Sequence, residues 1–347
     1  MISEESFKAA VLTKIAHPLE IFQLRIPELK RGQVLVKILY SAVCASQIYE
    51  VTGQRGPDRF LPHLLGHEGV GIVKGIGPGV SRFKIGQEVI LTWIQQDGLS
   101  CQLPLFESIE GKQVNSGLVT TFSEYSIVAE NRLFLAPKWK NKSLLPVFGC
   151  SALTGGGMVA GVKEKIRRCL VIGGGGVGTF AILALLARNA REIHLLEKNS
   201  KRRNLLDALS TTITVHETAS SKSLLDEIQN NGKFDLVFEC GGTAESLQKG
   251  IELTNTPGTL IFASHPKKGD QVWFDPHELI SGKKIIGSWG GGCVNSRLRE
   301  EVLTTFEKME DSVERLVSRT FPLDEINEAL NSAMNGSSIR VIISMSQ

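Results

Sequence analysis

The sequence predicts an α/β protein of two domains, in which a doubly wound parallel sheet is inserted into a β-rich domain. The first observation is the length of 347 residues, which is long for one compact domain. The second is a change of pattern near residue 150, from short β-rich runs to strands that alternate with helices. The third is a hydrophobic content of 42%, which is sufficient for two cores.

The β-rich region extends to about residue 146. Apolar or alternating runs at residues 33–40 and 69–75 predict strands, and the glycines and proline of residues 77–79 predict a turn. Short strands separated by such turns are typical of a barrel-like or irregular antiparallel domain.

From about residue 155, strands and helices alternate. Strands are predicted at 168–172, 192–197, 234–239 and 258–263, with helices at 179–188 and 201–210. This alternation predicts a parallel, doubly wound sheet. Helices at 297–309 and 323–334 then precede a strand at 339–343, which returns to the β pattern. We therefore expect an inserted domain at residues 152–289 and a second domain made of residues 1–151 and 290–347.

The composition argues against several classes of protein. A formal net charge of +3 is too small to indicate nucleic acid or a membrane surface as a partner. The first residues include Glu4 and Glu5 and no apolar run, so no signal peptide is expected. Residues 170–187 are the most apolar stretch, but their glycines favour a buried strand, turn and helix over a membrane span. We therefore expect a cytoplasmic protein.

A glycine-rich turn at residues 173–178 follows a predicted strand and opens a predicted helix. Its spacing satisfies Gly-x-Gly-x-x-Gly, the fingerprint of a dinucleotide-binding Rossmann fold. Glycine permits the tight turn and lets the backbone approach a pyrophosphate, which the helix N-terminus then faces. A turn with only a packing role is the alternative interpretation. The expected cofactor contacts in this turn are Gly173, Gly175, Gly176, Val177 and Gly178.

Glu197 ends the next predicted strand, about twenty residues after the turn. A carboxylate there accepts hydrogen bonds from the adenosine ribose and repels a 2′-phosphate, which favours NAD over NADP. The basic residues that follow Glu197 keep NADP as the less favoured alternative, although a solvated helix face explains at least Lys201 and Arg203. We expect Arg202 to contact the cofactor. These basic residues are Lys198, Lys201, Arg202 and Arg203.

Three residues of the types that bind zinc lie in the β-rich region or at its end: Cys44, His67 and Cys150. The six cysteines have no paired spacing, so we expect no disulfide framework. Taken singly, each candidate ligand is ordinary, because a lone cysteine is usually a core residue and Gly-His-Glu is often a turn.

Together with the glycine-rich turn, these segments resemble the zinc-containing medium-chain alcohol dehydrogenases over nearly the whole chain. The resemblance is carried by a Cys-x-Ser segment, a Gly-His-Glu-x-x-Gly-x-Val-like segment and a Gly-Cys-x-x-x-Thr-Gly segment, at residues 44–46, 66–73 and 149–155. It implies a GroES-like catalytic domain around an inserted Rossmann domain. It also implies a catalytic zinc bound by Cys44, His67 and Cys150, with Glu68 as an alternate ligand.

The family mechanism supplies roles for further residues. In the family, zinc stabilises an alkoxide while hydride leaves for NAD, and Ser46 would accept the hydroxyl proton. Arg340, in the final strand, would pair with the cofactor pyrophosphate, the alternative being a solvated arginine on an edge strand. The expected partner is a small alcohol or carbonyl compound, and the expected assembly is a homodimer or homotetramer.

Three departures from the family pattern stand out. Gln47 replaces the aspartate that commonly supports the ligand histidine, and Tyr49 replaces the histidine that commonly ends the proton relay. A phenol accepts a proton less readily than an imidazole, so the relay role of Tyr49 is the weaker expectation. Residues 95–120 contain only Cys101, too few thiols for a structural zinc site, so one zinc ion is expected.

Two competing hypotheses remain from the sequence. The first is a zinc-free quinone or enoyl reductase of the same superfamily, in which Cys44 and Cys150 are not both needed. The second is a cofactor-binding protein that kept the fold and lost turnover, since a fold alone does not prove activity. Retention of the three zinc ligands together with Ser46 argues against the second hypothesis.

Overall fold

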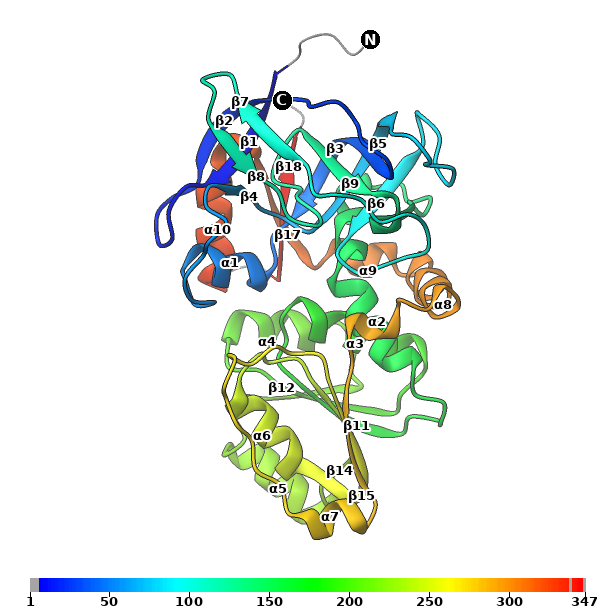
Figure 1. The fold of residues 1–347 in the computed structure, drawn as a ribbon. Coiled ribbons are helices and arrows are strands. Elements are labelled where there is room, and N and C mark those ends of the chain that lie inside the picture. The colour runs from blue at the N-terminus through cyan, green and yellow to red at the C-terminus, as the bar shows by residue number, and fades with distance from the viewer. Residues whose placement is uncertain (1–5, 337–338, 346–347) are drawn as a thin grey trace. The chain divides into compact units, whose positions relative to one another are not determined.

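The computed structural model describes residues 6–336 and 339–345 (Figure 1). The chain divides into two compact units, one made of residues up to 150 and from 313 onward, the other of residues 151–312. The second boundary therefore lies after residue 312, not at 290 as expected. The reason is helix α8 (Ser296–Glu307), which packs on helices α2 (Ser151–Ala160) and α3 (Gly176–Ala187) of the inserted unit.

The first unit contains a closed barrel and a separate seven-stranded sheet. The barrel order is β1-β2-β7-β8-β4, and its strands are β1 (Ser6–Leu12), β2 (Glu20–Arg25), β7 (Leu105–Ser108), β8 (Gln113–Asn115) and β4 (His63–Leu64). The sheet order is β10-β6-β5-β3-β18-β17, with β9 paired to β3. Its strands are β10 (Leu133–Leu135), β6 (Glu88–Thr92), β5 (Glu68–Ile76), β3 (Gln33–Ala42), β18 (Arg340–Ser344), β17 (Val317–Pro322) and β9 (Tyr125–Ala129).

Short helices connect and cover these strands. They are α1 (Ala45–Val51), η1 (Glu130–Arg132), η2 (Lys142–Gly149), α9 (Glu310–Glu314), η4 (Leu323–Glu325) and α10 (Ile326–Met334), α9 spanning the boundary between the units. Three of the elements bring the predicted ligands together: α1 follows Cys44, β5 follows His67, and η2 ends before Cys150.

The second unit is a six-stranded parallel sheet with the order β13-β12-β11-β14-β15-β16. This is the strand order of a doubly wound dinucleotide-binding fold. Its strands are β11 (Arg168–Ile172), β12 (Glu192–Leu196), β13 (Ile213–His216), β14 (Phe234–Glu239), β15 (Thr254–Phe262) and β16 (Lys283–Gly287). Its other helices are α4 (Ser200–Asp207), α5 (Lys222–Asn231), α6 (Ala244–Leu253), α7 (Pro276–Ile280) and η3 (Gly290–Gly292).

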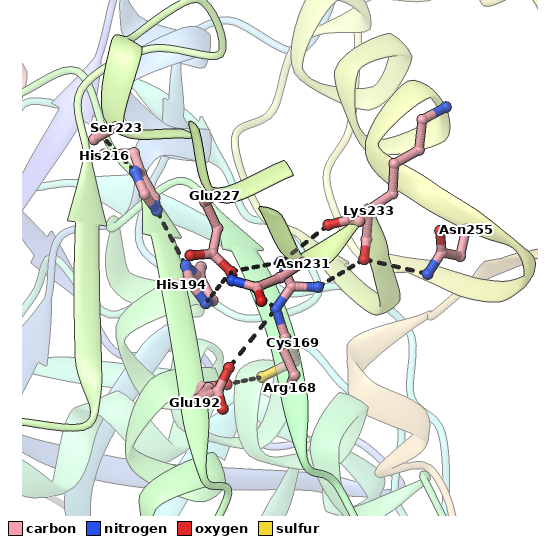
Figure 2. Close-up of polar contacts among 11 residues, drawn as sticks. Arg168, Cys169, Glu192, His194, His216, Ser223, Glu227, Asn231, Lys233 and Asn255 are labelled. Carbon is pink, nitrogen blue, oxygen red and sulfur yellow. Dashed lines mark hydrogen bonds and ion pairs between the residues drawn. The ribbon is translucent and has the colours of Figure 1, made fainter. Parts of the chain in front are cut away.

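A buried polar network lies across the strands of this sheet (Figure 2). Nδ1 of His194 lies 3.1 Å from Nε2 of His216, whose Nδ1 lies 2.9 Å from the Ser223 hydroxyl. Nε2 of His194 faces Glu227 at 3.8 Å, and Arg168 donates to that carboxylate at 2.8 Å. The two histidines are 3% and 1% exposed, so the network connects β11, β12, β13 and α5 inside the unit.

Within the described ranges, no single helix has the length and apolar character needed to cross a membrane. One bent pair of helices, Lys142–Gly149 with Ser151–Ala160, passes by length and composition alone. Every residue of the second helix is buried in the protein.

Candidate metal centre and nucleotide site

Cys44 follows strand β3 and is the N-cap residue of helix α1. Its backbone is extended (φ −112°, ψ 154°), as an N-cap residue requires. Oε1 of Gln47, three residues into the helix, accepts a hydrogen bond from the Cys44 backbone N–H at 3.1 Å. The geometry of the helix start therefore fixes the position of the Cys44 thiol.

His67 is positioned by the glycine before it. Gly66 has φ +91°, and an added Cβ would lie 2.5 Å from Oγ1 of Thr121. Nδ1 of His67 lies against the amide of Gln47 and 3.3 Å from the Ser46 hydroxyl. Nε2 is buried and, among the residues described, has no hydrogen-bond partner.

Cys150 approaches this histidine because Gly149 lets two segments come close together. A Cβ on Gly149 would lie 2.6 Å from Cα of Glu68, so any larger residue would push η2 away from β5. The hydroxyl of Thr92 donates to the Gly149 carbonyl at 2.7 Å and ties this segment to β6. Candidate ligand atoms of Cys44, His67 and Cys150 all lie within 4.8 Å of one another.

The charges of this cluster are coupled. A shared hydrogen bond between the two thiols sets the pKa of Cys44 well below its ordinary value and that of Cys150 well above it. Burial opposes a charge on His67, but the neighbouring Cys44 sulfur outweighs burial and raises the pKa of the imidazole. Two sulfurs and one unpartnered imidazole nitrogen form a donor set suited to zinc.

Glu68 lies beside the cluster, fully buried, and pairs with Arg340. Nη2 of Arg340 lies 2.5 Å from Oε1 of Glu68, and Arg340 is only 3% exposed. Burial raises the pKa of the Glu68 carboxyl, which the charge of Arg340 partly opposes. The interpretation of Arg340 as a solvated residue on an edge strand is wrong, because β18 lies between β3 and β17.

Two hydroxyls that the sequence analysis missed hold the backbone at Glu68. Ser41 donates to the Glu68 carbonyl at 3.0 Å, and Thr121 donates to the same oxygen at 3.3 Å. Both side chains are fully buried. No local pattern marks them, because they belong to segments that are brought together only by the fold.

Tyr49 lies on α1, half-buried. Within the part of the chain that the structure describes, its side chain forms no hydrogen bond to Ser46 or to a candidate zinc ligand. Its place at the end of a proton relay stays a prediction.

The glycine-rich turn has the close contacts that its motif predicts. Gly173 has φ +91°, and a Cβ on Gly178 would lie 1.8 Å from the Gly173 carbonyl oxygen. Gly175 is the N-cap of α3, and no atom lies within 4 Å of the place a Cβ would take. Gly176 and Val177 form the first turn of α3, where the backbone N–H groups have no partners within the helix. The cradle suits an anionic group.

Glu197 follows β12 and is tied to this turn. One carboxylate oxygen accepts from the Gly174 N–H at 2.6 Å and the other from the Asn199 N–H at 2.7 Å. Arg203 donates to the carbonyls of Glu197 and Lys198, so it does more than solvate a helix face. Nε of Arg202 is buried and has no hydrogen-bond partner in the described part of the chain.

Residues 95–120 form an irregular segment followed by the β7–β8 hairpin. Glu130, 1% exposed, ties Leu99 of the irregular part to residues 81–82 through three backbone N–H groups. Its Oε1 accepts from Ser81 at 2.8 Å and Arg82 at 2.7 Å, and its Oε2 accepts from Leu99 at 2.8 Å. Burial opposes ionisation of Glu130, but these bonds outweigh it and lower the pKa of the carboxyl.

Two other groups of potential metal ligands make contacts with other residues of the protein. In the first, His63 lies 2.7 Å from Asp58 and its Nδ1 lies 2.9 Å from the Leu64 carbonyl, so both ring nitrogens face oxygen acceptors. In the second, the guanidinium of Arg168 lies 2.8 Å from Glu227 and 3.7 Å from Glu192. Contacts within the protein therefore occupy His63 and Asp58 in the first group and Glu192 and Glu227 in the second.

Known proteins resemble the chain in both units. Residues 30–138 match the family model for the alcohol dehydrogenase GroES-like domain, and residues 176–308 match the one for zinc-binding dehydrogenases. The chain belongs to the zinc-containing medium-chain alcohol dehydrogenase family. It is 28% identical to alcohol dehydrogenase class-2 isozyme 2 of Oryctolagus cuniculus and 26% identical to alcohol dehydrogenase class-3 of Myxine glutinosa, with 97% of every chain covered.

The fold agrees with that of a solved family member. Benzyl alcohol dehydrogenase from Acinetobacter calcoaceticus superposes with a TM-score of 0.85 at 23% identity, covering 99% of this chain and 100% of the other. The expected GroES-like and Rossmann folds are thereby confirmed. As a member of the family, the chain is an alcohol dehydrogenase-type oxidoreductase.

Proposed function

We propose that the chain transfers hydride between a primary or secondary alcohol and NAD, using one zinc ion held by Cys44, His67 and Cys150. The observation that carries the proposal is the cluster of two sulfurs and a ring nitrogen of His67 within 4.8 Å, beside a buried Nε2 that has no hydrogen-bond partner among the described residues. This donor set leaves one tetrahedral position open, as a catalytic zinc site requires. The reverse reaction would reduce the matching aldehyde or ketone.

Bound zinc would polarise the alcohol oxygen as a Lewis acid, and bound NAD would accept the hydride. The chain's own residues prepare these events. Arg340 pairs with Glu68, and that carboxylate would serve as an alternate ligand. The hydroxyl of Ser46, half-buried beside His67, would accept the proton that the alcohol loses.

We further propose that NAD is preferred to NADP. The Glu197 carboxylate is fixed on the Gly174 and Asn199 amides, and a 2′-phosphate placed near it would be repelled. Gly173, Gly175, Gly176, Val177 and Gly178 would hold the pyrophosphate, and Arg202 and Arg340 remain proposed cofactor contacts.

The test is metal quantification on the same sample that is assayed with a panel of alcohols and carbonyls by NADH absorbance. The expected result is about one zinc per chain and turnover with some members of the panel. Cys150→Ser should lose both zinc and turnover, whereas Cys293→Ser, at a buried cysteine of the other unit, should keep both. A metal-free, active protein would support the zinc-free reductase. A zinc-loaded protein that turns over nothing would support the non-catalytic alternative.

Substrate class, partners, location and assembly are proposed together. We propose a small alcohol or carbonyl substrate, no nucleic-acid or membrane partner, a cytoplasmic location and assembly as a homodimer or homotetramer. The near-neutral formal charge of +3 supports the absence of a nucleic-acid or membrane partner.

A further inference from the structure

Gln47 joins the start of helix α1 to the candidate zinc centre. Its side chain is only 2% exposed, and its two ends contact different partners. Oε1 accepts from the Cys44 backbone N–H at 3.1 Å, which is one half of a capping box. Nε2 lies against Nδ1 of His67.

Zinc binding changes the hydrogen-bonding role of one partner of the Gln47 amide, His67. A histidine that binds a metal through Nε2 carries its hydrogen on Nδ1, which then needs an acceptor. The backbone N–H of Cys44 also needs an acceptor. A primary amide offers one acceptor oxygen, and its other end is a donor. Whichever way Gln47 is turned, one of the two N–H groups faces an NH₂ group.

We propose that Gln47 is a positioning residue that couples zinc binding to the cap of α1. When zinc occupies Nε2 of His67, the amide turns so that its oxygen accepts from Nδ1, and the Cys44 N–H loses its acceptor. Zinc binding thus opposes the cap, and the ion is held less tightly than it would be with a two-oxygen side chain at position 47. The inference rests on the zinc centre of the proposed function.

The first experiment follows the Cys44 amide in full-length protein labelled with ¹⁵N-cysteine, in which six cysteines give six backbone signals. Zinc addition should speed hydrogen exchange of the Cys44 amide by about tenfold, the equivalent of one neutral hydrogen bond. The Cys169 and Cys293 amides of the other unit are internal controls. Unchanged or slower exchange at Cys44 would mean that the Ser46 hydroxyl, 3.3 Å from Nδ1, accepts instead, and would overturn the proposal.

The second experiment measures zinc affinity by competition with a chromophoric chelator. Gln47→Glu supplies one carboxylate oxygen to the Cys44 N–H and the other to Nδ1 of His67. It should therefore bind zinc at least about tenfold more tightly, and hydrogen exchange of the Cys44 amide should stay slow with and without zinc. Gln96→Glu is the matched control, because Gln96 is a buried glutamine of the same unit that donates to the Ile94 carbonyl. It should leave zinc affinity unchanged.

The outcomes separate this inference from the proposed function. A parent protein that binds no zinc refutes the proposed function. A parent that binds zinc with the same affinity as Gln47→Glu refutes only the role of Gln47. Equal tightening by Gln47→Glu and Gln96→Glu would assign the effect to added charge and would also refute the role of Gln47.

Discussion

Arg340 and Glu68 form a buried ion pair whose members depend on each other. Arg340→Met would leave the Glu68 carboxylate without its cation at a fully buried position. We expect a loss of about 3–5 kcal/mol in the free energy of unfolding, because an uncompensated buried charge is strongly destabilising. The double variant Arg340→Met with Glu68→Gln should recover part of this loss. Urea denaturation measures these free energies of unfolding. Equal losses of stability in the single and double variants would contradict the dependence of Glu68 on Arg340.

At Glu197, the carboxylate should discriminate between the two nicotinamide cofactors. Glu197→Gln keeps one oxygen for the Gly174 and Asn199 amides but removes the negative charge. We expect the ratio of kcat/KM for NAD over NADP to fall at least about tenfold, which corresponds to about 1.4 kcal/mol. Glu217→Gln is the control, because Glu217 is an exposed carboxylate that pairs with Arg203. An unchanged ratio in Glu197→Gln would refute the assigned role.

At the scale of elements, Glu130 stabilises the irregular segment around residues 95–100 by joining Leu99 to residues 81–82. The fold lowers the pKa of the Glu130 carboxyl. Ionised Glu130 therefore stabilises the fold above the pKa of the unfolded carboxyl, and this stabilisation is lost as pH falls through the lower pKa of the folded state. Glu130→Gln should reduce the free energy of unfolding by about 2–3 kcal/mol near neutral pH, since it weakens bonds from three backbone amides. Chemical denaturation measures this, and exposed Glu107→Gln in β7 should have little effect. Equal stability in the two variants would contradict the prediction.

The histidine network should make the inserted unit sensitive to acid. Burial lowers the pKa of His194 from 6.5 to about 4, and the charge of Arg168 also lowers it while Glu227 opposes. The unfolded chain therefore binds more protons between these values, and the free energy of unfolding falls as pH drops through that window, by up to about 3 kcal/mol.

His194→Gln should flatten this dependence. Denaturation at pH 7 and pH 4.5 compares the parent, His194→Gln and His277→Gln, which alters an exposed histidine of the same unit. The expected result is a smaller difference between the two pH values only in His194→Gln. The same difference in all three proteins would show that His194 is not the titrating group.

Across the whole molecule, the sequence predicts strands, turns and motifs that are encoded locally. It does not predict contacts between residues that lie far apart in the chain. Strand β11 was predictable because the four residues after Arg168 are all apolar and lead into the glycine-rich turn. Strand β13 alternates polar and apolar residues over only four positions, and β16 begins with Lys283 and Lys284, so neither is marked as a buried strand. The cluster of Cys44, His67 and Cys150 could be predicted because each residue lies in a recognisable segment. The pairing of Glu68 with Arg340 could not, since nothing near either residue marks the other.

We expect the chain to self-associate through the β16 edge of the sheet in the inserted unit. Strand β16 ends the sheet order, so one edge of its backbone is open to pairing with another chain. Large apolar side chains lie on and near this edge: Ile286 is 45% exposed, Trp289 63% and Ile280 85%. Exposed apolar groups at an open strand edge favour a second copy of the chain, paired through β16.

Ile286→Lys should therefore weaken the assembly, because two copies would place like charges opposite each other at the joined edge. Sedimentation equilibrium should show a homodimer or homotetramer for the parent and a smaller species for Ile286→Lys. Ile85→Lys is the control, since Ile85 is 65% exposed in the other unit. It should leave the mass unchanged. If Ile286→Lys keeps the mass of an oligomeric parent, the interface lies elsewhere, and a monomeric parent would remove the expectation altogether.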